Sequence, residues 1–153
     1  MTNKEYVLEA MRRQGREAAL ALQDKSSSMT GTELNAEDGY IPDFKAAVAR
    51  MNMLDRKAGQ EDGFVCKSSA GRVVRLIQNY DSDTFTAEPE ELPAQYRFVW
   101  STDPDKARPF LASSTSYYNT GDCCLNAAGQ PKRSKIDVNT FDPDASPEYW
   151  EDP

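Results

Sequence analysis

The sequence contains no histidine and only three cysteines among its 153 residues. A serine or cysteine nucleophile is most often activated by a histidine base, so this absence argues against nucleophilic catalysis. Three thiols without histidine do not complete a tetrahedral zinc site, and an odd, small number of cysteines argues against a disulfide framework. We therefore expect reduced cysteines, no metal, no cofactor and no enzymatic activity.

Basic residues and long apolar segments are also scarce. The chain carries 18 Lys and Arg residues against 25 Asp and Glu residues, a formal net charge of −7, and has no basic cluster that could neutralise phosphates. No apolar run approaches the roughly 20 residues that span a bilayer, and the polar first residues lack the core of a signal peptide. We expect neither nucleic acid nor a membrane as a partner, and synthesis in the cytoplasm.

What the sequence does contain is a repeated pattern. Gly-x-x-Cys-x-x-x-Ala-Gly occurs at residues 63–71 and again, 58 residues later, at residues 121–129. Each copy is followed by basic and apolar residues, a Thr-Phe pair and a tryptophan. Matched spacing of this kind indicates an internal duplication. The apolar residues on both sides of Gly71 and Gly129 predict two β-hairpins with these glycines in the turns.

The repeated positions also predict the core of each module. A free cysteine commonly acts as a small buried side chain, and a tryptophan can close a small core. The expected core residues are Cys66, Phe85 and Trp100 in the first copy, and Cys124, Phe141 and Trp150 in the second. Because neighbouring strand residues point to opposite faces, we expect one of Cys123 and Cys124 to point inward and the other outward.

The N-terminal segment has the pattern of a helix. Thr2-Asn-Lys-Glu5 has the spacing of a capping box, and helix-forming residues without proline follow it. A seam with coiled-coil spacing runs through it, formed by Leu8, Met11, Gly15, Ala18 and Leu22. We expect the chain to form a homo-oligomer through this seam, with a trimer as the favoured arrangement. The alternative is that the same stripe covers the modules of its own chain.

These patterns predict a mainly β protein with an N-terminal helix, two tandem small antiparallel β modules and much ordered loop. The expected helix occupies residues 1–25 and serves oligomerisation or anchoring. A Ser-rich linker is expected at residues 26–40, the first β module at residues 41–103 and the second at residues 104–153. Modules of about 50 residues bury little surface, so mutual packing or oligomerisation should support them.

Six segments are characteristic as a group. They are Gly63-Phe-Val-Cys66, residues 71–78, Asn79-Tyr-Asp-Ser82, residues 88–96, Gly121-Asp-Cys-Cys124 and residues 146–151. Together they resemble phage and prophage virion proteins of Gram-positive bacteria, whose small β modules are similar to the chitin-binding type of carbohydrate-binding module, families 5 and 12. The resemblance covers residues 31–153 and implies compact three-stranded modules in tail, baseplate or head fibres.

The resemblance implies a non-enzymatic structural protein of the virion, made in the host bacterial cytoplasm, with itself and other virion proteins as partners. One alternative is an adhesin module that binds bacterial surface glycans, and a more distant one is an assembly connector between virion proteins. In sugar-binding modules exposed aromatic side chains stack on sugar rings. The candidate ligand-binding residues are Tyr80, Tyr117 and Tyr118, which adjoin polar turns.

Overall fold

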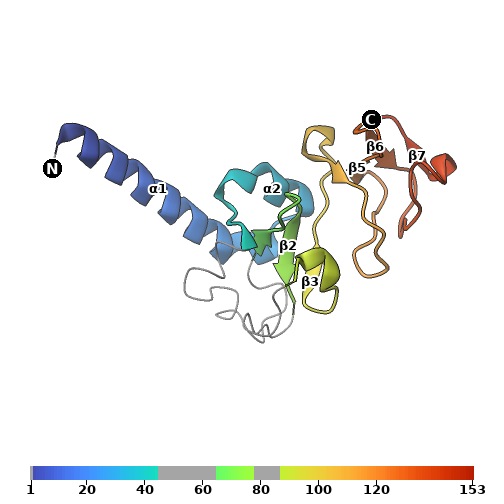
Figure 1. The fold of residues 1–153 in the computed structure, drawn as a ribbon, viewed down its shortest axis with the longest axis horizontal. Coiled ribbons are helices and arrows are strands. Elements are labelled where there is room, and N and C mark those ends of the chain that lie inside the picture. The colour runs from blue at the N-terminus through green and yellow to red at the C-terminus, as the bar shows by residue number, and fades with distance from the viewer. Residues whose placement is uncertain (1, 45–64, 78–86) are drawn as a thin grey trace.

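The computed structural model describes residues 2–44, 65–77 and 87–153. Its longest element is helix α1 (Asn3–Lys25), which projects from the remainder of the described chain, called the body below (Figure 1). The predicted capping box is confirmed. Thr2 Oγ1 accepts a hydrogen bond from the Glu5 backbone N–H at 3.2 Å, and the Glu5 carboxylate accepts one from the Thr2 N–H at 2.7 Å.

The segment expected to be a linker, residues 26–40, is a packed part of the fold. It forms the 3₁₀ turn η1 (Ser26–Ser28), helix α2 (Gly31–Ala36) and the 3₁₀ turn η2 (Asp38–Tyr40). Leu34 is fully buried in it, and Thr30 with Glu33 forms a second capping box that starts α2. The linker prediction was wrong because the serines, which suggested flexibility, precede a helix start that anchors an apolar side chain.

The strands form two small sheets, which confirms the mainly β architecture with an N-terminal helix. The first sheet is antiparallel and contains β1 (Val65–Lys67), β2 (Val73–Leu76) and β3 (Tyr96–Phe98) in that order. The second contains β4 (Arg108–Pro109), β5 (Cys123–Leu125), β6 (Pro131–Ser134) and β7 (Trp150–Glu151), with β4 parallel to β5 and the other pairs antiparallel. The later described residues also form the 3₁₀ turns η4 (Pro89–Glu91), η5 (Pro104–Lys106) and η6 (Pro147–Tyr149).

The two hairpins have the same register, and the glycines lie in the turns as the repeated pattern predicted. Cys66 pairs with Val74, and 58 residues later Cys124 pairs with Lys132. Gly71 and Gly129 have positive φ angles of 81° and 77°, and each donates its N–H to the carbonyl three residues earlier at 2.9 and 3.0 Å. Both turns therefore need the left-handed conformation that glycine adopts without a steric penalty.

The duplication extends further toward the N-terminus than the repeated sequence pattern. Turn η2 leads to Asp43, which forms a parallel bridge with Lys67 of β1. Turn η5 leads with the same spacing to Pro109 of β4, which pairs with Leu125 of β5. The next residue is a phenylalanine in both cases. We therefore define the first repeat as residues 38–98 and the second as residues 104–152.

The expected equivalence of Trp100 and Trp150 is wrong. Trp150 lies opposite Ser134 on β7, the last strand of the second sheet, where the first sheet has Tyr96 of β3 opposite Leu76. The connection from β6 to β7 is shorter than the one from β2 to β3, so equal spacing along the chain indicated the wrong aromatic residue. A proline three residues before the aromatic residue, Pro93 or Pro147, is the local signal that marks the true match.

The first sheet is buried on both faces. One face packs on the N-terminal helices, where Val65 and Val73 join Leu22, Leu34 and Ile41. The other face belongs to a cluster that continues into the second repeat, formed by Phe44, Cys66, Val74, Leu76, Tyr96, Phe98, Trp100, Tyr118, Cys124 and Trp150. Because a single cluster contains residues of both repeats, neither sheet completes its core alone.

Candidate functional site

Aromatic stacking places both tryptophans in the core, as predicted. The rings of Trp100 and Tyr118 stack with centroids 4.3 Å apart, and Tyr118 meets Trp150 edge to face at 5.4 Å. Both indole N–H groups donate hydrogen bonds to backbone carbonyls, Trp100 to Ser116 at 2.8 Å and Trp150 to Phe141 at 2.9 Å. With their polar atoms satisfied inside the protein, the tryptophans pack in the core that the two repeats share.

The structure corrects the ligand-binding role expected for Tyr118. Its side chain is fully buried, its hydroxyl oxygen accepts a hydrogen bond from the Leu111 N–H at 3.2 Å, and burial raises the pKa of its phenol. Tyr80, the second ligand-binding candidate, lies outside the described part of the chain, as does Phe85, which was expected in the core. Tyr117 is therefore the candidate that can be placed at a surface, with 37% of its side chain exposed.

Tyr117 borders a groove of about 450 Å³ between the end of β3 and the loop that precedes β5. The lining residues are Gly31, Arg97, Phe98, Val99, Trp100, Thr115, Ser116, Tyr117, Asn119 and Asp122. The groove combines an exposed phenol with hydroxyl, amide, guanidinium and carboxyl groups. Its polar groups include both hydrogen-bond donors and acceptors, which suit a polyhydroxylated molecule, and the tyrosine ring offers a flat apolar contact.

A network of backbone hydrogen bonds holds the loop beside this groove. Tyr118 and Asn139 exchange two backbone hydrogen bonds, and Asp122 accepts one from the Asn119 N–H at 2.8 Å. Burial raises the pKa of Asp122, the nearby Asp137 carboxylate adds to this effect, and the Asn119 N–H opposes it. Val138 has a φ angle of 50°, a strained conformation for a β-branched residue, and its N–H donates to Asn119 Oδ1 at 3.1 Å.

The cysteines are structural in their surroundings. All three are free and buried, with Cys66 and Cys124 in the core as predicted. Cys123 is also buried, so the expectation that one neighbour points outward was wrong. Its sulfur lies 3.6 Å from the Thr102 and Gly121 carbonyl oxygens, and either of them can accept its single S–H proton. Burial is the main cause that raises the pKa of Cys124 to about 12, which keeps this thiol protonated and unreactive.

Phe141, expected in the core, is instead 42% exposed and stacks on Tyr149 with ring centroids 4.3 Å apart. The core position predicted for Phe141 from the repeated Thr-Phe pair is therefore wrong, and its ring lies on the surface of the second repeat. Its backbone is nevertheless fixed, because the Phe141 N–H donates to Asn139 Oδ1 at 3.0 Å and its carbonyl accepts the Trp150 indole.

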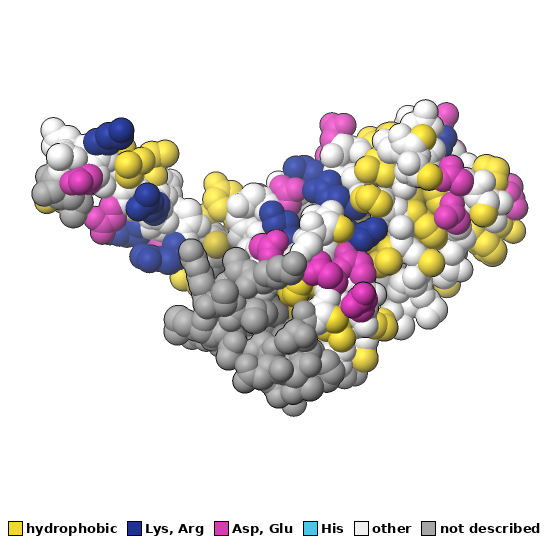
Figure 2. Space-filling view, in the orientation of Figure 1, with side chains coloured by type: hydrophobic (Ala, Val, Ile, Leu, Met, Phe, Trp, Pro, Cys, Tyr) yellow, Lys and Arg dark blue, Asp and Glu magenta, His cyan; other side chains and the backbone are white. Residues whose placement is uncertain are grey.

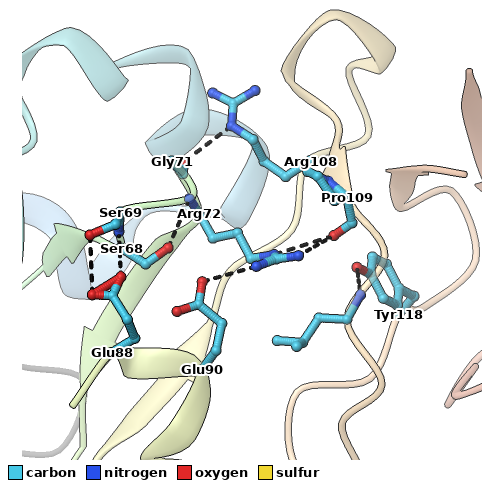
Figure 3. A network of polar contacts seen from close by, with 10 residues as sticks. Ser68, Ser69, Gly71, Arg72, Glu88, Glu90, Arg108, Pro109 and Tyr118 are labelled. Atoms are coloured by element: carbon cyan, nitrogen blue, oxygen red, sulfur yellow. Dashed lines mark hydrogen bonds and ion pairs between the residues drawn. The ribbon is translucent and has the colours of Figure 1, made fainter. Parts of the chain in front are cut away.

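A polar junction fastens the hairpin turn of the first repeat to β4 of the second (Figure 3). Arg72 pairs with Glu90 at 2.9 Å and donates twice to the Pro109 carbonyl, at 2.7 and 3.2 Å. Arg108 donates to the Gly71 carbonyl at 3.0 Å and pairs with Asp38 at 3.1 Å. One difference between the two sequence copies marks this junction. Arg72 follows the turn glycine in the first copy, whereas Gln130 follows it in the second.

Helix α1 divides into a contacting and a free part. Leu22, expected in an intermolecular seam, is buried in the body, where the Gln23 side chain also exchanges hydrogen bonds with the Val65 backbone at 2.6 and 2.9 Å. Ala18 is half-buried, whereas Leu8 and Met11 are 41% and 63% exposed. Figure 2 shows hydrophobic side chains gathered at the free end of the helix beside charged ones.

Comparison with known proteins adds no relative: no family model, curated protein or solved structure matches the chain. Among the helices of the described residues, none has the length and apolar character needed to cross a membrane. The described part of the chain also contains no group of three or more His, Cys, Asp or Glu residues placed to hold a metal ion.

Proposed function

We propose that this chain is a non-enzymatic structural protein of a phage particle, part of a tail, baseplate or head fibre, in which α1 attaches the chain and the body is displayed outward. The observation that carries the attachment role is the projecting part of α1, with Val7, Leu8 and Met11 exposed together. The virion context rests on the resemblance of residues 31–153 to phage virion proteins.

The energetics of the helix favour a partner. A helix of this length is marginal in water on its own, and only its last turns pack on the body. The rest of the helix exposes neighbouring apolar side chains to water, and association would gain free energy by removing them from water. Copies of the chain can therefore bind one another through α1 without contact between their bodies.

Sedimentation of the full chain tests this role. Removal of α1 would also delete Leu22 and Gln23, which the body needs, so we prefer substitutions. Leu8→Gln with Met11→Gln should abolish self-association without changing the urea midpoint of the body. The matched control is Leu20→Gln, at a residue 52% exposed on another side of the helix. A wild-type chain that remains monomeric at sub-millimolar concentration would contradict the attachment role.

The groove at Tyr117 favours a second candidate function, adhesion to bacterial surface glycans. A shallow site with one exposed aromatic ring and several hydrogen-bonding groups should bind each sugar weakly, and several copies on a particle would compensate by avidity. The test is binding of the oligomeric protein to host wall or capsule preparations. Tyr117→Ala should abolish binding and Phe141→Ala, an exposed aromatic residue outside the groove, should not. Equal binding by both variants would remove the groove from this role.

A further inference from the structure

The body lies against the same side of α1 that carries the exposed apolar residues. Leu8, Met11, Gly15, Ala18 and Leu22 follow one another in steps of three and four, so they fall on one side of the helix. Along this side Leu8 and Met11 are exposed, Gly15 and Ala18 are half-buried, and Leu22 is buried. The body therefore covers the seam at its C-terminal end, at Leu22, and leaves Gly15 open, since no atom lies within 4 Å of a Cβ added there.

This arrangement leaves a short stripe free for another chain. The stripe consists of Lys4, Val7, Leu8 and Met11, spaced as i, i+3, i+4 and i+7, and we call it the tip stripe. A parallel bundle that used the whole seam would bring the bodies of all copies to the same end and to the inner side of the bundle, where they would overlap. The full-length parallel trimer expected from the sequence pattern is thus sterically disfavoured.

We propose that two copies of this chain pair antiparallel through their tip stripes, with the two bodies at opposite ends of the helix pair. The proposal rests on the self-association proposed above and adds the orientation and the stoichiometry. A pair centred between Val7 and Leu8 places these residues across from each other, and places Lys4 of one copy across from Met11 of the other.

The charges beside the tip stripe favour the antiparallel orientation. Glu5 and Arg12 lie on the same flank of the stripe, two helical turns apart. In an antiparallel pair the same flanks face each other, so Glu5 of each copy lies next to Arg12 of the other. In a parallel pair the ammonium groups of the two Lys4 side chains would lie in the same layer and repel each other, and Glu5 would face apolar Val7.

Glu5, Leu8, Glu9 and Arg12 line a notch on the flank of the helix beside the tip stripe, and Leu8 belongs to both. In the antiparallel pair this flank faces the same flank of the partner, so the partner's Arg12 lies beside the Glu5 carboxylate. A contact limited to about two helical turns buries much less than a standard protein interface, so we expect a weak dimer that forms at sub-millimolar concentration.

Crosslinking of introduced cysteines tests the orientation. The three natural cysteines are buried, so a short bis-maleimide should react with surface cysteines in the folded chain. A Lys4→Cys chain carrying a size tag is mixed with an untagged Met11→Cys chain, and the tag separates mixed from like pairs on a gel. The expected product is the mixed pair. Tagged Lys4→Cys mixed with Leu20→Cys is the control and should give only background product.

The outcomes separate this proposal from the one on which it rests. Predominant like pairs, or no crosslink in a chain that sediments as a dimer, would overturn the antiparallel orientation and leave self-association intact. A monomeric wild-type chain would overturn both. Charge reversal at Arg12 is an independent readout, because it leaves the Thr2–Glu5 capping box intact. Arg12→Glu should weaken the dimer several-fold by placing a carboxylate next to Glu5 of the partner. An Arg12→Glu chain that dimerises like the wild type would contradict the pairing.

Discussion

Substitution of Gly31 by alanine should destabilise the protein, although helix propensity predicts the opposite. Gly31 is the first residue of α2, and alanine is favoured over glycine within helices by about 1 kcal/mol. A Cβ atom at this position would, however, overlap the Trp100 carbonyl oxygen and lie 3.2 Å from both the carbonyl carbon and Val99 Cγ1. Since two of these atoms belong to the backbone, α2 must move away from the end of β3.

The size of the effect follows from the two opposing contributions. Overpacking that forces a backbone shift costs about 1–3 kcal/mol, and here the shift would also strain the Asn35 side-chain amide, which donates to the Gly31 and Val99 carbonyls at 2.8 and 3.0 Å. We expect a net loss of about 2 kcal/mol in the free energy of unfolding, measured by urea denaturation. Gly39→Ala is the matched control, because no atom lies within 4 Å of its added Cβ. A Gly31→Ala chain as stable as the Gly39→Ala chain would refute the reasoning.

Three further predictions concern the junction, the repeated turn and the groove. Arg72→Met should lower the free energy of unfolding by about 2–3 kcal/mol in urea, because it leaves the Glu90 carboxylate and the Pro109 carbonyl without their donor. Gly129→Ala should cost about 1 kcal/mol, because its φ of 77° penalises a Cβ although the space is open, and an equal cost for Gly39→Ala would contradict the shared turn. Burial raises the pKa of Asp122, so stability from this group is present below its ordinary pKa and is lost as the pH rises through the raised value. Asp122→Asn should therefore flatten the pH dependence of the urea midpoint above about pH 4, and an unchanged profile would contradict the assigned environment.

Local signals in the sequence predicted the local parts of the fold. The Thr2 capping box starts α1, and the two turn glycines have the conformation that their repeated positions predicted. These features depend on residues close in the chain, where side-chain and backbone geometry act directly. The same kind of signal at Thr30 and Glu33 marks α2, and the serine-rich composition beside it led to the wrong interpretation as a linker.

The candidate site depended on contacts between distant residues. Tyr117 and Tyr118 are adjacent and chemically identical, and the packing of Tyr118 against Trp100, Phe110 and Trp150 decides which ring is buried. The groove at Tyr117 joins Arg97 from β3 with Asn119 and Asp122 from a later loop, so no local motif announces it. Chain counting also failed for Trp150, because loop length can change in one repeat while the strand pairing is retained.

The two sheets differ in character at one pair of equivalent positions. In the first repeat Val74 lies opposite Phe98, and this apolar pair is buried in the shared core. At the matching positions of the second repeat, Lys132 forms an ion pair with Asp152 at 2.6 Å, and the Asp152 side chain is 83% exposed. An apolar surface packed here would have to desolvate both charges without adding a partner for them. The same pair of strand positions is therefore apolar in the first repeat, where the core covers it, and charged in the second, where it is exposed to solvent.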